Sequence, residues 1–261
     1  MSDITLWQWL LAGLAALIVG CAKTGLPGLG LLAVPLMAVA FGGRVSVGAL
    51  LPMLIVADCC AVWWYRRHAQ WLHLRRLVPW VVVGLTVGFV LMWWLALMEV
   101  QQQAVDAWFT PLLGAVIMLM LLMLVLRRWL GDQLTPQQPG MVVLCGSGAG
   151  VATFMANAAG PMMTLYLSAM GMRKQAFMGT NAWFFLLLNV IKVPLFVLLG
   201  ILVPQAPLIT ADSLMVNLWV APLIILGVIL GRHVFRAVSE RLFELSVLSL
   251  AALASVYLLL S

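Results

Sequence analysis

Uncharged apolar segments recur along the whole 261-residue chain, and no other feature restricts its fold as strongly. A run of about 18 or more apolar residues is long enough for a helix to cross the hydrocarbon core of a bilayer. Only 8% of the residues are charged, whereas soluble domains average about 25%. We therefore predict an all-α polytopic membrane protein with 8 to 10 membrane segments. The apolar segments cover approximately residues 5–21, 29–42, 46–65, 77–97, 108–127, 141–155, 159–172, 178–202, 214–231 and 242–260.

Two pairs of these segments are short and are interrupted by residues that break helices. The break Lys23-Thr24-Gly25-Leu26-Pro27-Gly28 separates 5–21 from 29–42. The break Asn157-Ala158-Ala159-Gly160-Pro161 separates 141–155 from 159–172. Glycine and proline are the strongest local signals for ending or kinking a helix. Each pair is either a re-entrant hairpin or two short crossings, and the sequence leaves both arrangements open.

The charges of the loops predict the side of the membrane on which each loop lies. Cytoplasmic loops of membrane proteins carry an excess of Lys and Arg. Basic loops alternate along this chain with loops that carry Glu99, Asp106 or Asp212 and no base, and only Arg44 departs from this pattern. Both termini are therefore predicted to lie on the outer side of the membrane, opposite the cytoplasm. The bases assigned to cytoplasmic positions are Arg66, Arg67, Arg75, Arg76, Arg127, Arg128, Arg173, Lys174, Arg232, Arg236 and Arg241.

The two halves of the chain carry matching residues in the same order, at offsets that grow from 130 to 143 residues along the chain. The clearest match is Pro79-x4-Gly84-x3-Gly88 with Pro222-x4-Gly227-x3-Gly231, because three helix-modifying residues recur at the same spacing. Since the loop charges give the halves opposite orientations, we predict two inverted-topology repeats, residues 1–131 and 141–261, joined by a linker at 132–140. Each repeat would contain one broken helix pair and three transmembrane helices. Further matched pairs are Gly20 with Gly150, Gly48 with Gly179, and Asp58 with Asn189.

Three charged residues lie neither in loops nor at the ends of apolar segments: Asp58 and Lys192 inside segments, and Lys23 in the first break. A charge at the centre of a membrane helix costs about 2.5–3.5 kcal/mol on insertion scales, so such residues are functional candidates. An ion pair between Asp58 and Lys192, across the interface of the repeats, is one expectation. The pair would be either structural or part of a coupling site with Asp58 as the protonatable group. Asn189 is the repeat partner of Asp58 and lies one turn from Lys192, so we include it with them.

The two breaks carry residues suited to binding an anion. Inverted repeats with broken helices are typical of secondary transporters, whose substrate site lies between the repeats. Helix N-termini favour anions, and the segments that begin near Gly28–Gly30 and at Gly160 would supply two. The plainer interpretations are that Lys23 reaches lipid headgroups and that Asn157 satisfies backbone groups freed by the break. The candidate substrate-binding residues are Lys23, Thr24, Gly28, Gly30, Thr153, Asn157, Gly160 and, more weakly, Asn181.

Other classes of function find no support in the sequence. The four cysteines lie within apolar segments and form no metal-ligand motif, and the three histidines lie in basic loops. No phosphate-binding loop or nucleophile–base arrangement is present, so we expect neither an enzyme nor a cofactor. The net charge of +6 is explained by the cytoplasmic loops, so we expect no nucleic acid as partner.

Several stretches resemble the signatures of the sulfite exporter TauE/SafE family of membrane permeases. They are 23–36 (Lys23-Thr24-Gly25-Leu26-Pro27-Gly28 and the residues after it), 155–161, 177–185 and Asn189-x2-Lys192-Val193-Pro194. The resemblance implies a multi-pass protein of the bacterial inner membrane that moves sulfite, organosulfonates or related anions and is coupled to protons. In that membrane, the termini that the loop charges place outside would be periplasmic. It also implies that Lys23, Thr24, Asn157 and Asn181 lie at motif positions of the central site.

The leading hypothesis is a secondary transporter that exports small sulfur-containing anions by alternating access. Its partners would be the anion, protons and the lipid bilayer. A passive anion channel and a non-transporting membrane subunit of a larger complex are the alternatives. The sequence leaves open which anion is carried and whether the chain forms a homodimer.

Overall fold

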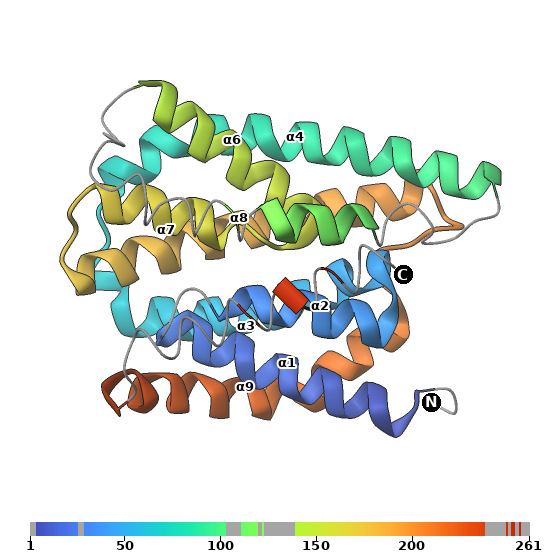
Figure 1. Cartoon of the computed structure of the whole chain (residues 1–261), viewed down its shortest axis with the longest axis horizontal. Coiled ribbons are helices and arrows are strands. Elements are labelled where there is room, and N and C mark those ends of the chain that lie inside the picture. Colours follow the sequence, from blue (N-terminus) through green and yellow to red (C-terminus); the bar gives the residue numbers. More distant parts are fainter. Residues whose placement is uncertain are drawn as a thin grey trace.

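The computed structural model describes residues 4–25, 29–102, 111–119, 122, 139–237, 249, 252–253 and 256, and every regular element in this part of the chain is a helix (Figure 1). Half of the predicted segment 108–127, and most of the predicted segment 242–260 and linker 132–140, lie outside these residues. The helices are α1 (Leu6–Thr24), α2 (Gly30–Phe41), α3 (Gly43–Tyr65), the 3-10 helix η1 (Arg66–His68), α4 (Trp71–Gln102), α6 (Pro139–Ala156), α7 (Gly160–Ala169), α8 (Lys174–Leu202) and α9 (Ala211–Ala237).

Six helices in the described part are long and apolar enough to cross a membrane: α1, α3, α4, α6, α8 and α9. Large apolar side chains point away from the protein along them, as Leu218 and Trp219 of α9 do with 77% and 63% of their surface exposed. Such surface is unfavourable in water and favourable in lipid. The chain is therefore an all-helical integral membrane protein.

Each predicted broken pair consists of one helix of spanning length and one short helix. In the first pair α1 has 19 residues and α2 has 12. In the second pair α6 has 18 residues and α7 has 10. At 1.5 Å per residue, α2 is about 18 Å long and α7 about 15 Å, well below the ~30 Å of a hydrocarbon core. Neither short helix can cross a membrane alone.

The long helices run in two opposite directions. In Figure 1, α1 and α9 run from the right of the view towards the left, whereas α4 and α8 run from left to right. The end of α3, the start of α8 and the last turns of α9 meet at one end of the bundle, where Tyr65, Lys174 and Arg232 line a common cavity. Two of the bases predicted to be cytoplasmic, Lys174 and Arg232, thus lie at this end, and its assignment to the cytoplasm stays a prediction.

Glycines allow helices of one half to pack directly on helices of the other. A Cβ atom at Gly20 of α1 would overlap the backbone of α9 at Ile224, and one at Gly150 of α6 would overlap the backbone of α4 at Val81. Small residues at such crossings let two helix backbones approach closely, which is a main source of stability for helices in lipid. The α1–α9 and α4–α6 contacts therefore join the first half of the chain to the second.

Arg44, the base that departed from the loop-charge pattern, is not a loop residue. It lies in the first turn of α3, is 3% exposed, and its Nη1 donates a hydrogen bond to the carbonyl of Ala206 at 3.3 Å. A buried arginine held in this way is part of the packing between α3 and the connection from α8 to α9. It therefore carries no information about which side of the membrane that end faces.

Gly48 offers a direct test of this packing. A Cβ atom there would overlap the carbonyl of Leu208, whereas a Cβ atom at Gly200 would have nothing within 4 Å. Overpacking costs about 1–3 kcal/mol or more, while Gly→Ala at an open helical site is neutral or stabilising by up to about 1 kcal/mol. Gly48→Ala is therefore expected to lower the melting temperature of the purified protein by roughly 5 °C or more, and Gly200→Ala should leave it unchanged or raised. Equal melting temperatures for the two variants would contradict the described packing.

Candidate functional site

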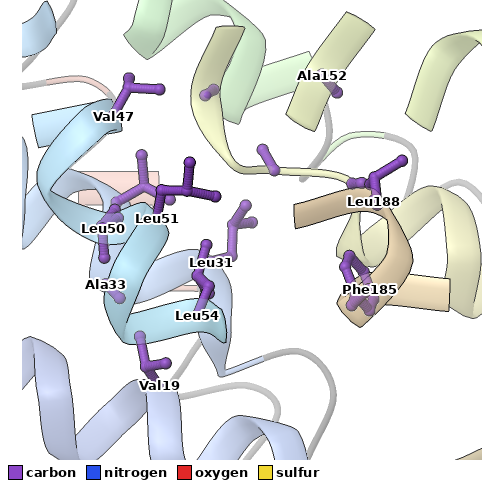
Figure 2. Close-up of a cluster of buried hydrophobic side chains, with 14 of the residues drawn as sticks. Val19, Leu31, Ala33, Val47, Leu50, Leu51, Leu54, Ala152, Phe185 and Leu188 are labelled. Carbon is purple, nitrogen blue, oxygen red and sulfur yellow. The ribbon is translucent and has the colours of Figure 1, made fainter. Parts of the chain in front are cut away.

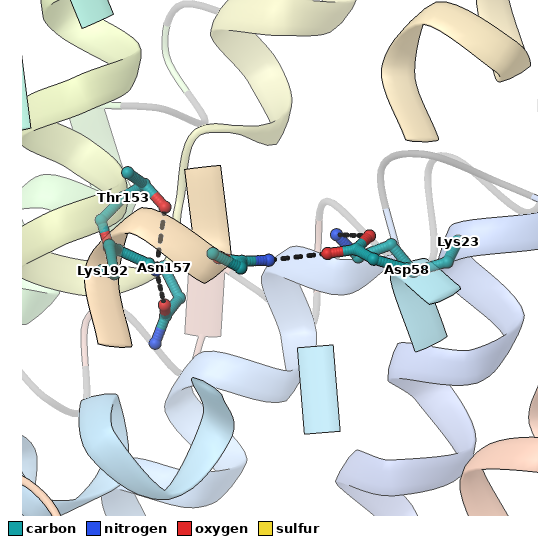
Figure 3. Close-up of polar contacts among 6 residues, drawn as sticks. Lys23, Asp58, Thr153, Asn157 and Lys192 are labelled. Carbon is teal, nitrogen blue, oxygen red and sulfur yellow. Dashed lines mark hydrogen bonds and ion pairs between the residues drawn. The ribbon is translucent and has the colours of Figure 1, made fainter. Parts of the chain in front are cut away.

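Charged and amide side chains from α1, α3 and α8 meet inside the bundle (Figure 3). Lys23 lies in the last turn of α1, and its Nζ is 2.8 Å from Oδ1 of Asp58 in α3. The other carboxylate oxygen of Asp58 accepts a hydrogen bond of 2.7 Å from Nδ2 of Asn189 in α8. Asp58 is fully buried and Asn189 is 1% exposed, so this contact between the two halves excludes solvent.

A second group of polar side chains surrounds Lys192, one turn further along α8. The Lys192 ammonium is fully buried and donates to Oδ1 of Asn157 at 2.5 Å, to Oγ1 of Thr153 at 3.1 Å and to the Thr153 carbonyl at 3.2 Å. These three acceptors match the three protons of an ammonium group. All three acceptors are neutral. The hydrogen-bonding capacity of Lys192 is therefore satisfied, but no acidic side chain among the described residues lies within salt-bridge distance of it.

Asn157 is held in place by the way in which α6 ends. It has φ = 51°, a left-handed conformation that asparagine adopts more readily than most residues. The turn is fixed by hydrogen bonds from the Asn157 amide to the Thr153 carbonyl and from the Ala158 amide to the Ala152 carbonyl. The side chain then spans the two halves, because Nδ2 donates to the Val47 carbonyl at 2.9 Å while Oδ1 faces Lys192. The break in the second pair thus positions an acceptor for the buried lysine.

Apolar side chains enclose both groups. Figure 2 shows buried residues of α1, α2 and α3 (Val19, Leu31 and Leu51 among them) facing Phe185 and Leu188 of α8. The Lys23 ammonium lies 4.0 Å from the centroid of the Phe185 ring, and the Lys192 ammonium lies 5.7 Å from that of Phe196. In such surroundings electrostatic interactions are much stronger than in water. An ion that enters the site is therefore strongly attracted or repelled by the charged side chains there.

When all three groups are ionised, Lys23, Asp58 and Lys192 carry two positive charges and one negative charge. Lys23 and Asp58 neutralise each other, and Lys192 leaves one positive charge in excess. Burying an unpaired charge is costly, and a buried charge is usually paired or bound to a ligand. A small anion beside Lys192 and Lys23 would balance the cluster. Among the described residues no group of three or more His, Cys, Asp or Glu side chains could hold a metal ion.

The structure brings together some of the predicted residues and separates others. The expected Asp58–Lys192 ion pair is wrong: Asp58 pairs with Lys23, and Lys192 bonds to Thr153 and Asn157. The hydroxyl of Thr24 donates to the Val228 carbonyl of α9 at 2.7 Å and faces away from Asp58. The reason is the ~100° between consecutive residues of a helix, which directs neighbouring side chains to different faces.

The remaining predicted residues lie around this cluster. Gly30 is the first residue of α2 and its Cβ position would be 3.5 Å from Cβ of Ala22, so α2 begins close to the end of α1. Gly160 is the first residue of α7. Asn181 is buried in α8 but lies two turns, about 12 Å along the axis, from Asn189. Gly28 falls outside the described residues.

Sequence reasoning missed Phe185. It lies midway between Asn181 and Asn189, and residues four apart share a helix face, so its place on the polar face of α8 could have been found from the spacing alone. Tyr65 was also missed. Its hydroxyl donates to the Thr24 carbonyl at 3.1 Å and so ties the end of α3 to the end of α1.

Comparison with known families gives one match, which covers nearly the whole chain. The family model described as sulfite exporter TauE/SafE matches residues 12–258. This range includes both breaks and every residue of the cluster. Neither the comparison with curated proteins nor that with solved structures found a match.

Proposed function

This chain belongs to the sulfite exporter TauE/SafE family, a family of membrane transporters and not of enzymes, and we propose that it exports small sulfur-containing anions such as sulfite or organosulfonates by alternating access. In this proposal the chain lies in the bacterial inner membrane with both termini in the periplasm. The substrate binds between the two halves at Lys23, Thr153, Asn157 and Lys192.

The observation that carries the proposal is the burial of Lys192 without an acidic side chain within salt-bridge distance in the described part of the chain. Its ammonium is fully buried and has only neutral acceptors, namely the Asn157 side chain and two oxygens of Thr153. At about 4 Å and an effective dielectric constant of 20, a unit anion would gain about 4 kcal/mol from such a charge. That is enough to select anions over neutral molecules of the same shape by about three orders of magnitude.

Packing between the halves supports the prediction that they are inverted repeats. The matched glycines Gly48 and Gly179 both lie against connecting segments of the other half: a Cβ atom at Gly48 would overlap Leu208, and one at Gly179 would lie 2.6 Å from the Tyr65 carbonyl oxygen. Gly20 and Gly150 are also a matched pair, and each lies against a helix of the other half: Gly20 against α9 and Gly150 against α4. The contact between Asp58 and its repeat partner Asn189 is what a two-fold axis between α3 and α8 would produce. On this basis the repeats are residues 1–131 and 141–261, with a linker at 132–140.

Asp58 gives the site a route to proton coupling. While Asp58 is ionised it holds Lys23 at 2.8 Å. Once Asp58 takes up a proton its charge is lost, and Lys23 is free to turn from the carboxyl group to an anion beside Lys192. Proton binding at Asp58 and anion binding at the two lysines would then favour each other, which is the linkage that a coupled transporter needs.

Binding of an anion to the folded protein is tested most simply by thermal stabilisation. A ligand at 100 times its dissociation constant stabilises the folded state by about 2.7 kcal/mol, which corresponds to a rise of roughly 5–10 °C for a chain of this size. Sodium sulfite, methanesulfonate, thiosulfate and acetate are compared at equal ionic strength with choline chloride as the reference. At least one sulfur oxyanion should stabilise the wild type and not Lys192→Met. If none does so, the cluster is not an anion site.

A further inference from the structure

The ends of α1, α3, α8 and α9 enclose a cavity of about 240 Å³. Pockets for drug-sized ligands usually measure about 300–1,000 Å³, so this one suits a small ion with a few waters. The residues that line it are Thr24, Gly25, Tyr65, Lys174, Gln175, Met178 and Arg232. Two of these are bases and none is acidic, so the charge of the lining favours an anion.

The position of the cavity links it to the buried cluster. Thr24 and Gly25 directly follow Lys23 in the chain, and Lys23 is the one member of its ion pair with solvent exposure, 11% against 0% for Asp58. The Tyr65 hydroxyl donates to the Thr24 carbonyl at 3.1 Å and so lies between the cavity and the end of α1. The cavity therefore adjoins the end of α1 that carries Lys23.

Arg232 is placed to draw anions into this space. It lies in α9, is exposed, and its guanidinium is 5.2 Å from the centroid of the Trp64 ring. Stacking on an aromatic ring orients a guanidinium while leaving its N–H donors available for planar oxyanions. A cleft lined by one sign of charge raises the local concentration and association rate of opposite ions by about 10-fold or more.

We propose that this cavity is a second anion site, an entrance site in which a small free oxyanion such as a sulfonate is held by Arg232 and Lys174 before it reaches Lys23. The role of this site in transport rests on the proposed function, but the measurement of anion binding described next does not require transport. The site would bind anions from this end of the bundle only. An anionic lipid headgroup has similar chemistry and is the competing occupant.

The test measures how fast sulfhydryl reagents of opposite charge reach a cysteine placed in the cavity. Gln175→Cys is made after the four native cysteines have been replaced by alanine, and Gln70→Cys, an exposed position that does not line the cavity, is the matched control. Each protein reacts with a sulfonate-bearing methanethiosulfonate and with its trimethylammonium analogue in phosphatidylcholine nanodiscs. The anionic-to-cationic rate ratio should be about 10-fold higher at residue 175 than at residue 70. Equal ratios would overturn the proposal.

Two further measurements test whether Arg232 attracts the anion and whether a free anion or a lipid headgroup occupies the cavity. Arg232→Gln should lower the ratio at residue 175 at least threefold, whereas Arg67→Gln, an exposed base that does not line the cavity, should not; equal effects of the two variants would overturn the proposal. Added methanesulfonate should slow the anionic reagent at residue 175. If phosphatidylglycerol slows it and methanesulfonate does not, the cavity is a lipid site and the proposal is wrong. Labelling needs no transport, so failure here leaves the function of the buried cluster untouched.

Discussion

Replacing Lys192 with methionine is expected to lower the rate of anion transport by about 100- to 1,000-fold while the protein remains folded. Methionine has nearly the length of lysine and no charge, so it removes the unpaired ammonium from between Thr153 and Asn157. An interaction of about 4 kcal/mol corresponds to about three orders of magnitude in kcat/KM. The measurement is the initial rate of methanesulfonate or sulfite exchange in proteoliposomes, with the melting temperature recorded for each variant.

Two companion variants separate the charge of Lys192 from its hydrogen bonds. Lys192→Gln keeps a donor for Asn157 but has no charge, so it should lose transport as fully as the methionine variant. Arg67→Met removes an exposed base from η1 and should change neither transport nor stability, since exposed charges contribute little. If Lys192→Gln transports at the rate of the wild type, Lys192 has a structural role and the proposed anion site is wrong.

Replacing Asp58 with asparagine is expected to abolish proton-driven accumulation while exchange of anions across the membrane continues. The amide has the shape of the carboxyl group and can still bond to Lys23 and Asn189, but it takes up no proton in this range of pH. Lys23 would lose its ion pair and be permanently free to bind an anion. The expected result is a loss of at least 10-fold in accumulation driven by a pH gradient, with counterflow of labelled anion within about threefold of the wild type.

The matched control for this variant is Asp212→Asn. Asp212 is an exposed acid in the first turn of α9, far in sequence from the cluster, so its neutralisation should leave coupling unchanged. Removal of one partner from a buried ion pair can destabilise a protein by about 3–5 kcal/mol. The double variant Asp58→Asn with Lys23→Met removes both charges and should recover part of any stability that is lost. Retained proton-driven accumulation in Asp58→Asn would rule out Asp58 as the coupling group.

Much of the site was predictable from the sequence because charges inside apolar segments are rare. Lys23, Asp58 and Lys192 were identified in this way, and all three lie in the bundle interior. Asn157 was identified because it follows an apolar segment at a break, and its left-handed backbone explains why the break occurs there. The all-helical membrane class followed from the same pattern, because the backbone of an apolar segment of about 20 residues satisfies its own hydrogen bonds in lipid as a helix.

The pairing of these residues was not predictable, because it depends on how the helices are rotated. Asp58 and Lys192 have opposite charges on segments expected to be neighbours, yet Lys23 reaches Asp58 first from the last turn of α1. Thr24 was grouped with Lys23 by its place in the motif, but helical geometry turns its hydroxyl to Val228 of α9. Position along the chain shows which residues share a segment, and only the packing shows which of them share a site.

Transport of an anion against its concentration gradient is measured as accumulation of radiolabelled methanesulfonate in proteoliposomes under an imposed pH gradient. Methanesulfonate stays ionised over the whole pH range used, so it does not redistribute as a weak acid. We predict that the wild type raises the internal concentration above the external one when the gradient has one sign, and that Lys192→Met and an ionophore that dissipates the gradient both abolish this. If the anion only equalises across the membrane, whatever the sign of the pH gradient, the protein is a passive channel and the proposed coupled transport is wrong.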